Sequence, residues 1–186
     1  MYQFRKGTEL LNLCQRYELN IDEIMLRCEM EESGQSREQI WDLMQDNLQV
    51  MQDSISKGLD PDLKSVGGLV GGNASKVQFY IEKDNLCGKT ILKAITYALA
   101  VSECNAAMGK IVAAPTAGAS GILPGILVAL AEEKDYSQEE LVKALFVAAA
   151  VGKIIAANAT LSGAEGGCQA ECGSASSMAA AAAVFL

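Results

Sequence analysis

The residues best able to do chemistry in this chain are Glu165, Cys168 and Cys172. They lie in the most polar and cysteine-rich stretch of its later part, residues 158–173. Glu165 stands beside glycines and can serve as a general acid, a general base or a solvated charge. On a helix, thiols four residues apart share one face, but two thiolates complete neither a zinc site nor an iron-sulfur cluster. The spacing therefore leaves metal binding and packing of small cysteines both open.

A second candidate is the segment Ser65–Asn73. It contains four glycines within six residues: Gly67, Gly68, Gly71 and Gly72. Such a density weakens regular structure and is typical of backbone that turns sharply or closely approaches a ligand. The free N–H groups of such a loop can bind an anion, either a carboxylate or a phosphate. The spacing matches neither the P-loop nor the dinucleotide fingerprint, so a nucleotide is not indicated, and a flexible connector is the alternative.

A third candidate is the small-residue loop Pro115–Gly121, which carries two hydroxyl groups, on Thr116 and Ser120. Pro124 fits the first position of a helix running to about Glu133, and a helix N-terminus favours bound anions. Close packing of small residues explains the composition equally well.

Capping residues and hydrophobic periodicity predict the helices that position these segments. We expect helices at Thr8–Tyr17, Ile21–Glu32, from Ser36 to Gly58, at Thr90–Met108, at Pro124–Glu133 and over residues 138–157. Capping-box spacing occurs three times: Asn20 with Glu23, Ser36 with Gln39, and Ser137 with Glu140. A further apolar helix is expected to begin near Ser176. Only Lys76–Ile81 alternates in the manner of a short strand, so the predicted fold is all-α.

Charge divides the chain into two parts. Residues 1–62 hold 6 basic and 13 acidic side chains, a net charge of −7, whereas residues 63–186 hold 9 and 10, a net charge of −1. We interpret the first part as amphipathic scaffold helices and the second as an apolar core rich in glycine and alanine.

Composition excludes several functions. A net charge of −8 and a pI near 4.6 argue against nucleic acid or an anionic membrane surface as the partner. The chain has no histidine, which excludes a Ser-His-Asp triad, a Cys-His pair or an imidazole zinc ligand from its own residues. The uncharged stretch Ile111–Ala131 contains too many prolines and glycines for a membrane span. With no secretory signal visible, we expect reduced thiols and a cytoplasmic location.

Two strings, Ala114–Pro124 and Gly163–Gly173, resemble signatures of the alpha chain of iron-sulfur-dependent L-serine dehydratase. The resemblance extends over the whole chain and includes Ser65–Gly72 and Glu103–Gly109. It implies a largely helical domain over residues 1–186 that works with a separate or fused beta portion, as a hetero- or homo-oligomer. It also implies a [4Fe-4S] cluster held by three cysteines.

Residue by residue, Cys168 resembles the first of the three cluster ligands. The resemblance places the other two beyond residue 186, and Cys172 is interpreted as a non-ligand. The chain thus resembles an alpha chain truncated at its C-terminus, and alone we expect it to be inactive. The cluster's open iron would act as a Lewis acid while L-serine loses ammonia to give pyruvate. The general base is Glu165 or, as we favour, a beta-chain histidine. The residues expected to bind L-serine are Ser65, Gly67, Gly68, Gly71, Gly72, Asn73, Thr116, Gly118, Ser120 and Gly121.

Two alternatives remain open. A pyridoxal-phosphate dehydratase also uses glycine-rich anion loops, but it needs a Schiff-base lysine, and neither Lys110 nor Lys153 has a recognisable motif around it. The second alternative is a non-catalytic interaction subunit or an inactive fragment.

In the favoured interpretation, three segments converge on one cleft: Ser65–Asn73, Pro115–Gly121 and Glu165–Cys168.

Overall fold

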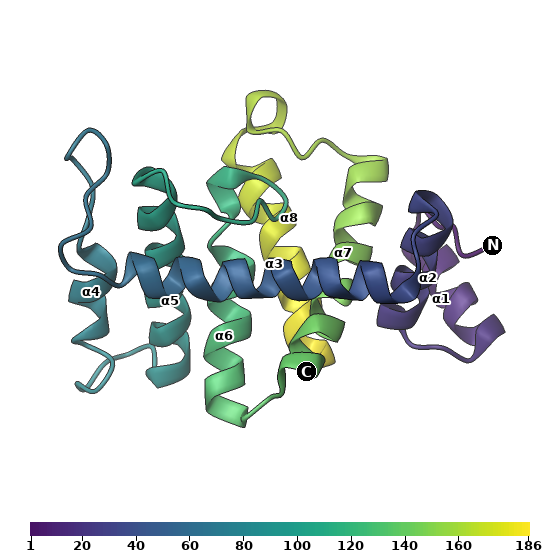
Figure 1. The fold of residues 1–186 in the computed structure, drawn as a ribbon, viewed down its shortest axis with the longest axis horizontal. Coiled ribbons are helices and arrows are strands. Elements are labelled where there is room, and N and C mark those ends of the chain that lie inside the picture. Colours follow the sequence, from purple (N-terminus) through teal and green to yellow (C-terminus); the bar gives the residue numbers. More distant parts are fainter. The chain divides into compact units, whose positions relative to one another are not determined.

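The computed structural model describes all of residues 1–186, and its regular elements are helices only (Figure 1). The elements are α1 (Gly7–Tyr17), α2 (Ile21–Ser33), α3 (Arg37–Gly58), α4 (Asn73–Gln78), α5 (Lys89–Ala106), the short 3-10 helix η1 (Ala117–Ala119), α6 (Ile122–Lys134), α7 (Gln138–Asn158) and α8 (Gly163–Phe185). The predicted all-α fold is confirmed. None of these helices combines the length and the apolar character needed to cross a membrane.

The chain forms two compact units, and the long helix α3 contributes to both. The first unit comprises Met1–Leu48 and Ser137–Leu186, and the second comprises Gln49–Tyr136. The change of composition at residue 62 therefore falls inside the second unit.

Helix α7 is the centre of the first unit, where it packs against α2 and α8. It is apolar around most of its circumference because neighbours cover most of its faces. Apart from Met178, the side of α8 that is buried carries small residues, which permits close packing of helices. The largest fully buried side chains of this unit are Ile24, Leu26, Leu48, Leu141, Val142 and Phe146.

Two of the three predicted capping boxes form. At α7 the Ser137 hydroxyl accepts from the N–H of Glu140, and the Glu140 carboxylate accepts from the N–H of Ser137. Ser36 and Gln39 exchange the equivalent bonds before α3. The third predicted capping box, Asn20 with Glu23, is wrong, because the Asn20 side chain makes no capping hydrogen bond and the Glu23 carboxylate binds two arginines instead.

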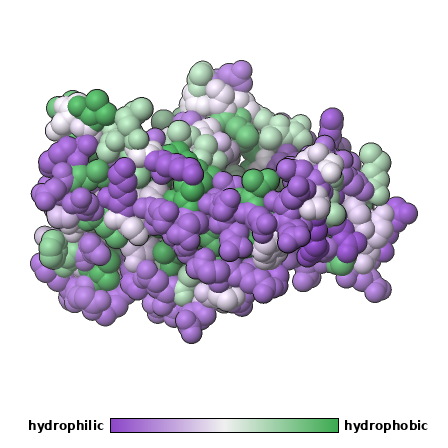
Figure 2. Space-filling model, in the orientation of Figure 1, coloured by the Kyte–Doolittle hydropathy of each residue, from purple (hydrophilic) through white to green (hydrophobic).

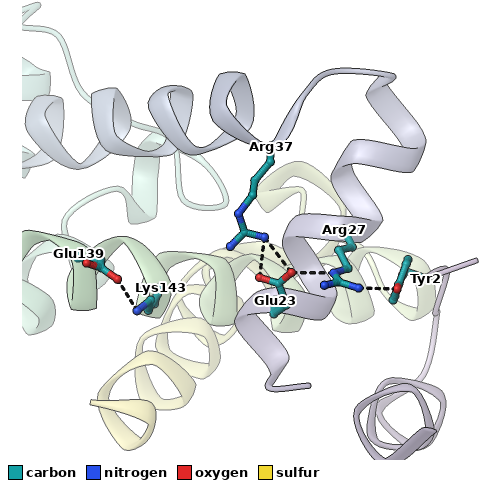
Figure 3. A network of polar contacts seen from close by, with 6 residues as sticks. All are labelled: Tyr2, Glu23, Arg27, Arg37, Glu139 and Lys143. Atoms are coloured by element: carbon teal, nitrogen blue, oxygen red, sulfur yellow. Dashed lines mark hydrogen bonds and ion pairs between the residues drawn. The ribbon is translucent and has the colours of Figure 1, made fainter. Parts of the chain in front are cut away.

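Glu23 instead joins α2 to the start of α3 (Figure 3). Its carboxylate accepts from Arg27 Nε at 2.6 Å and from Arg37 Nη1 at 2.8 Å, and Arg27 also donates to the Tyr2 hydroxyl. Burial alone raises the pKa of Glu23, but the hydrogen bonds and charges of the two arginines outweigh it, so the pKa lies below its ordinary value. The network ties the N-terminal segment and two helices together.

We expect Glu23→Gln to lower the free energy of unfolding by about 1 kcal/mol at pH 7, because the two charge-assisted bonds are weakened. Because the pKa of Glu23 is lower in the folded state, its ionised carboxylate stabilises the folded protein at pH values above the unfolded-state pKa of about 4.3. This stabilisation is lost as the pH falls through the folded-state pKa. Urea unfolding at pH 7 and at about pH 3 should therefore show the difference at the higher pH only. Glu139→Gln is the matched control, since Glu139 makes only an exposed i,i+4 pair with Lys143 (Figure 3). An equal loss in both variants would contradict the prediction.

The second unit is organised by α5, which packs against α4 and α6. Its core contains Ile55, Ala74, Tyr97, Ala100, Val101 and Ala129. Tyr97 donates its hydroxyl to Glu132, which also pairs with Lys93 and links α5 to the end of α6.

Three predicted boundaries are wrong. The segment proposed as a strand, Lys76–Ile81, begins inside α4 and continues as turns. Helix α6 begins at Ile122, so Pro124 lies in its first turn rather than at its first position. The N–H groups of the whole first turn have no partner within the helix, so proline loses no hydrogen bond there. Helix α8 begins at Gly163 rather than near Ser176, with Ser162 capping it and a break at Gly167, whose φ is 68°.

Candidate functional site

The glycine-rich segment Ser65–Asn73 begins with a turn closed by Ser65. The N–H of Ser65 donates to the carbonyl of Val70 at 2.8 Å, and the Ser65 hydroxyl accepts from the N–H of Val70 at 3.0 Å. The N–H of Gly68 donates to the Ser65 carbonyl, and that of Val66 donates to Ala106 at the end of α5. Five N–H groups of the segment are thus bonded within the protein, while those of Gly67, Leu69, Gly71 and Gly72 have no hydrogen-bond partner.

The tip of this turn is exposed and apolar. The exposed fractions are 79% for Val66, 93% for Leu69 and 43% for Val70, and hydrophobic surface is visible there in Figure 2. The predicted binding glycines Gly67 and Gly68 lie in this exposed part, and Gly68 adopts a positive φ of 69°. Glycine is needed at Gly68 for backbone conformation.

The end of the segment is packed closely. A Cβ on Gly71 would lie 2.1 Å from the carbonyl oxygen of Leu63, and Gly72 adopts a φ of 74°. The next two N–H groups, of Asn73 and Ala74, donate to the carboxylate of Glu103 on α5, at 2.8 and 3.3 Å. The anion held at this end of the loop is therefore a side chain of the protein itself.

The sequence interpretation gave Glu103 no role. A lone acidic residue in the otherwise apolar part of a helix was the signal available, and the structure buries it to 3% exposure. A buried carboxylate needs strong hydrogen-bond partners, and the start of α4 supplies them.

The second loop, Pro115–Gly121, is attached to the same end of α5. The side-chain amide of Asn105 donates to the carbonyl of Ala117 at 3.3 Å. The Ser120 hydroxyl is buried and donates to the same carbonyl at 2.8 Å. The Thr116 hydroxyl is buried and has no hydrogen-bond partner. Of the two predicted hydroxyls, Thr116 is the one without a hydrogen-bond partner within the protein.

The remaining residues of this loop differ in their surroundings. Gly118 is exposed, whereas Gly121 is buried, and a Cβ on Gly121 would lie 2.3 Å from the carbonyl oxygen of Ala98. A pocket of about 230 Å³ between α5 and residues 118–122 includes both glycines, but its lining is mainly apolar. The hydroxyl in this lining, on Ser102, already donates to Ala98. The structure thus supports a packing role for Gly121.

We expect Gly125→Ala, one turn further along α6, to lower the free energy of unfolding by about 1–3 kcal/mol. Its Cβ would lie 2.8 Å from the Ala94 carbonyl oxygen and 3.0 Å from the N of Ala98, so α6 would have to move away from α5. Urea unfolding measures the change. Gly173→Ala on α8 is the control, because its Cβ meets nothing within 4 Å and alanine favours a helix. A stable Gly125→Ala variant would show that this contact is not tight.

The third predicted segment, Glu165–Cys168, belongs to the first unit and is helical rather than a loop. Glu165 is exposed in the first turn of α8 and accepts a hydrogen bond of 2.6 Å from the Thr160 hydroxyl. Cys168 directly follows the break at Gly167, and Cys172 lies one turn later. Both thiols are free and exposed. The convergence of this segment with the two loops of the second unit stays a prediction.

The cysteines fit an iron-sulfur cluster only in part. Cys168 is exposed, whereas Cys28 and Cys104 are buried, and burial raises the pKa of both thiols, which disfavours the thiolate form that binds metal. No three side chains of the His, Cys, Asp or Glu type are grouped as a metal site. Any cluster that Cys168 binds would therefore need further ligands that are not grouped around it in this structure.

Comparison with known proteins gives a consistent result. The sequence model "Serine dehydratase alpha chain" matches residues 16–186. The chain is 45% identical over 182 residues to the probable L-serine dehydratase, alpha chain, of Bacillus subtilis (strain 168), covering 97% of this chain and 60% of that protein. It is 38% identical over 177 residues to the L-serine dehydratase, alpha chain, of Peptoniphilus asaccharolyticus, covering 95% of this chain and 61% of that protein.

An L-serine dehydratase of Streptomyces coelicolor (strain ATCC BAA-471 / A3(2) / M145) is 37% identical over 184 residues, covering 97% of this chain and 40% of that protein. The chain thus spans about 60% of the alpha chains it matches and less of this relative. Because the family match covers nearly the whole chain and includes both signature strings, Ala114–Pro124 and Gly163–Gly173, the chain belongs to the serine dehydratase alpha chain family.

Proposed function

We propose that this chain binds L-serine and takes part in its conversion to pyruvate and ammonia, as the alpha portion of an L-serine dehydratase. Relatives that carry this name in three bacteria support the proposal. The reaction removes the α-proton and the hydroxyl group of serine, and the aminoacrylate formed then hydrolyses.

The observation that carries the proposal is the attachment of two small-residue loops to one turn of α5. Val66 bonds to Ala106, and Asn105 bonds to Ala117, so Ser65–Asn73 and Pro115–Gly121 are held by neighbouring residues of the same helix. Both loops offer backbone and hydroxyl groups that suit a small polar substrate, and the large apolar side chains of the first loop, Val66, Leu69 and Val70, lie at its exposed tip. The Thr116 hydroxyl has no hydrogen-bond partner within the chain, and in this proposal it bonds the serine carboxylate or hydroxyl.

The general base is proposed to come from the beta portion. Glu165 is the candidate within this chain, but it is exposed and already bonded to Thr160. A carboxylate that is exposed to solvent and already hydrogen-bonded within its own chain is not placed to reach an α-proton, which a general base must approach to hydrogen-bond distance. The chain supplies no imidazole, so a histidine would have to come from the partner.

The proposed cofactor is a [4Fe-4S] cluster with Cys168 as one ligand. When bound, such a cluster supplies a Lewis acid at an iron that no cysteine occupies. The role of this chain's own residues is to donate one thiolate and to hold the substrate in the loops of the second unit.

The test is pyruvate formation from L-serine by the complete enzyme that contains this chain, assayed anaerobically with and without the beta portion, together with iron and sulfide analysis. We expect activity that requires the beta portion and follows the iron content. Absence of pyruvate with both portions present and iron bound would overturn the proposed activity. Activity that follows added pyridoxal phosphate instead would favour the other class of dehydratase.

A further inference from the structure

We infer that Glu103 is a positioning residue for the serine loop Ser65–Asn73, acting through the backbone at the start of α4. The inference rests on the proposed function, since it assigns a role at the same site. Glu103 does not need to touch the substrate. It fixes the backbone from which the loop extends.

The contacts of Glu103 carry the inference. It is the only charged residue of the chain that is buried, and both of its hydrogen bonds come from backbone N–H groups, those of Asn73 and Ala74. No lysine or arginine pairs with it. A carboxylate placed in this way satisfies two donors that a helix leaves unpaired at its N-terminus.

The loop has little else to hold it at this end. Helix α4 contains six residues, too few to be stable alone in water, and the preceding Gly71 and Gly72 have no side chains for packing. Removing the carboxylate would leave two N–H groups unpaired at the point where the loop enters the helix. Glu103 therefore determines whether the end of the loop keeps one conformation.

Residues 103–106 of α5 hold the other loop as well. Glu103 binds the end of the first loop and Ala106 its beginning, while Asn105 binds the second loop through Ala117. A shift of the first loop relative to this turn would alter its distance from Thr116. Loss of Glu103 should therefore weaken serine binding more than it slows the chemical step.

The experiment compares Glu103→Gln with wild type in the complete enzyme. Glutamine keeps the shape but presents one acceptor and one donor to two N–H groups, so one bond is lost. We expect the KM for L-serine to rise about 10-fold while kcat changes less than about 3-fold. Hydrogen exchange of peptides covering residues 66–78 should accelerate about 10-fold or more. Glu103→Asp keeps the charge on a shorter side chain and should give a smaller change in both measurements.

Glu132→Gln is the matched control, because Glu132 also joins elements of the second unit by hydrogen bonds but contacts neither loop. It should leave the KM and the exchange of residues 66–78 unchanged. Three outcomes would overturn the positioning role: an unchanged KM in Glu103→Gln, an equal effect of Glu132→Gln on the KM, or failure of both Glu103 variants to fold. If wild type does not deaminate serine, the proposed function fails, and unchanged exchange in Glu103→Gln would separately refute the structural step.

Discussion

Replacing Cys168 by alanine is expected to lower serine deamination by the complete enzyme at least ~100-fold and to remove most of its bound iron. A thiolate ligand contributes directly to metal affinity, and even residues that only support a ligand change affinity or activity by 10- to 100-fold. Cys168 is exposed at the break in α8 and has no hydrogen bond that would commit it to the fold. Pyruvate formation, iron and sulfide content and the visible absorption of the cluster measure the effect.

Cys172→Ala is the matched control, since this thiol is also exposed and lies one turn further along the same helix. It should keep both its iron and its activity. Full iron content and normal activity in Cys168→Ala would show that Cys168 is not a ligand. Equal loss in both variants would instead indicate that both thiols bind the cluster.

Most helices of this chain could be predicted because their signals are local. The boxes formed by Ser137 with Glu140 and by Ser36 with Gln39 lie within four residues of sequence, and the structure makes both. The same spacing at Asn20 and Glu23 failed because two arginines take the carboxylate: Arg27, one turn further along α2, and Arg37, fourteen residues away. Charged partners, one local and one brought by the fold, outweigh a neutral local cap.

Nonlocal contacts explain the wrong boundaries as well. The start of α4 depends on Glu103, thirty residues from Asn73, so no local pattern around Lys76–Ile81 contained it. The early turns of α8 are rich in glycine, which weakens a helix by about 1 kcal/mol per residue. The Ser162 cap and the packing of α8 against α7 allow it to begin at Gly163 all the same.

The candidate loops were found from their composition, but their internal bonding could not be. Glycine density identified Ser65–Asn73, and small residues identified Pro115–Gly121. Which N–H and hydroxyl groups stay free depends on where α5 places Glu103, Asn105 and Ala106. That placement requires the fold.

Thr116→Val is expected to change stability and activity in opposite directions. The Thr116 hydroxyl is buried without a hydrogen-bond partner, so the folded protein bears the cost of its desolvation. Valine has a similar shape and no polar group, and we expect it to raise the free energy of unfolding by about 1 kcal/mol. If the hydroxyl bonds to L-serine, its loss should lower kcat/KM by about 10- to 100-fold, since a hydrogen bond to a charged group contributes about 1.5–3 kcal/mol.

The control is Thr96→Val on α5, where the hydroxyl is also buried but donates to the Leu92 carbonyl at 2.7 Å. Because that hydroxyl is already satisfied within the helix, its removal should not stabilise the protein, and serine kinetics should stay unchanged. Urea unfolding and steady-state assays of both variants in the complete enzyme make the comparison. A Thr116→Val enzyme with normal kcat/KM would remove Thr116 from the serine site. A Thr116→Val enzyme that is both less stable and less active would mean that the hydroxyl has a structural partner, so that its effect on activity arises from the fold rather than from contact with the substrate.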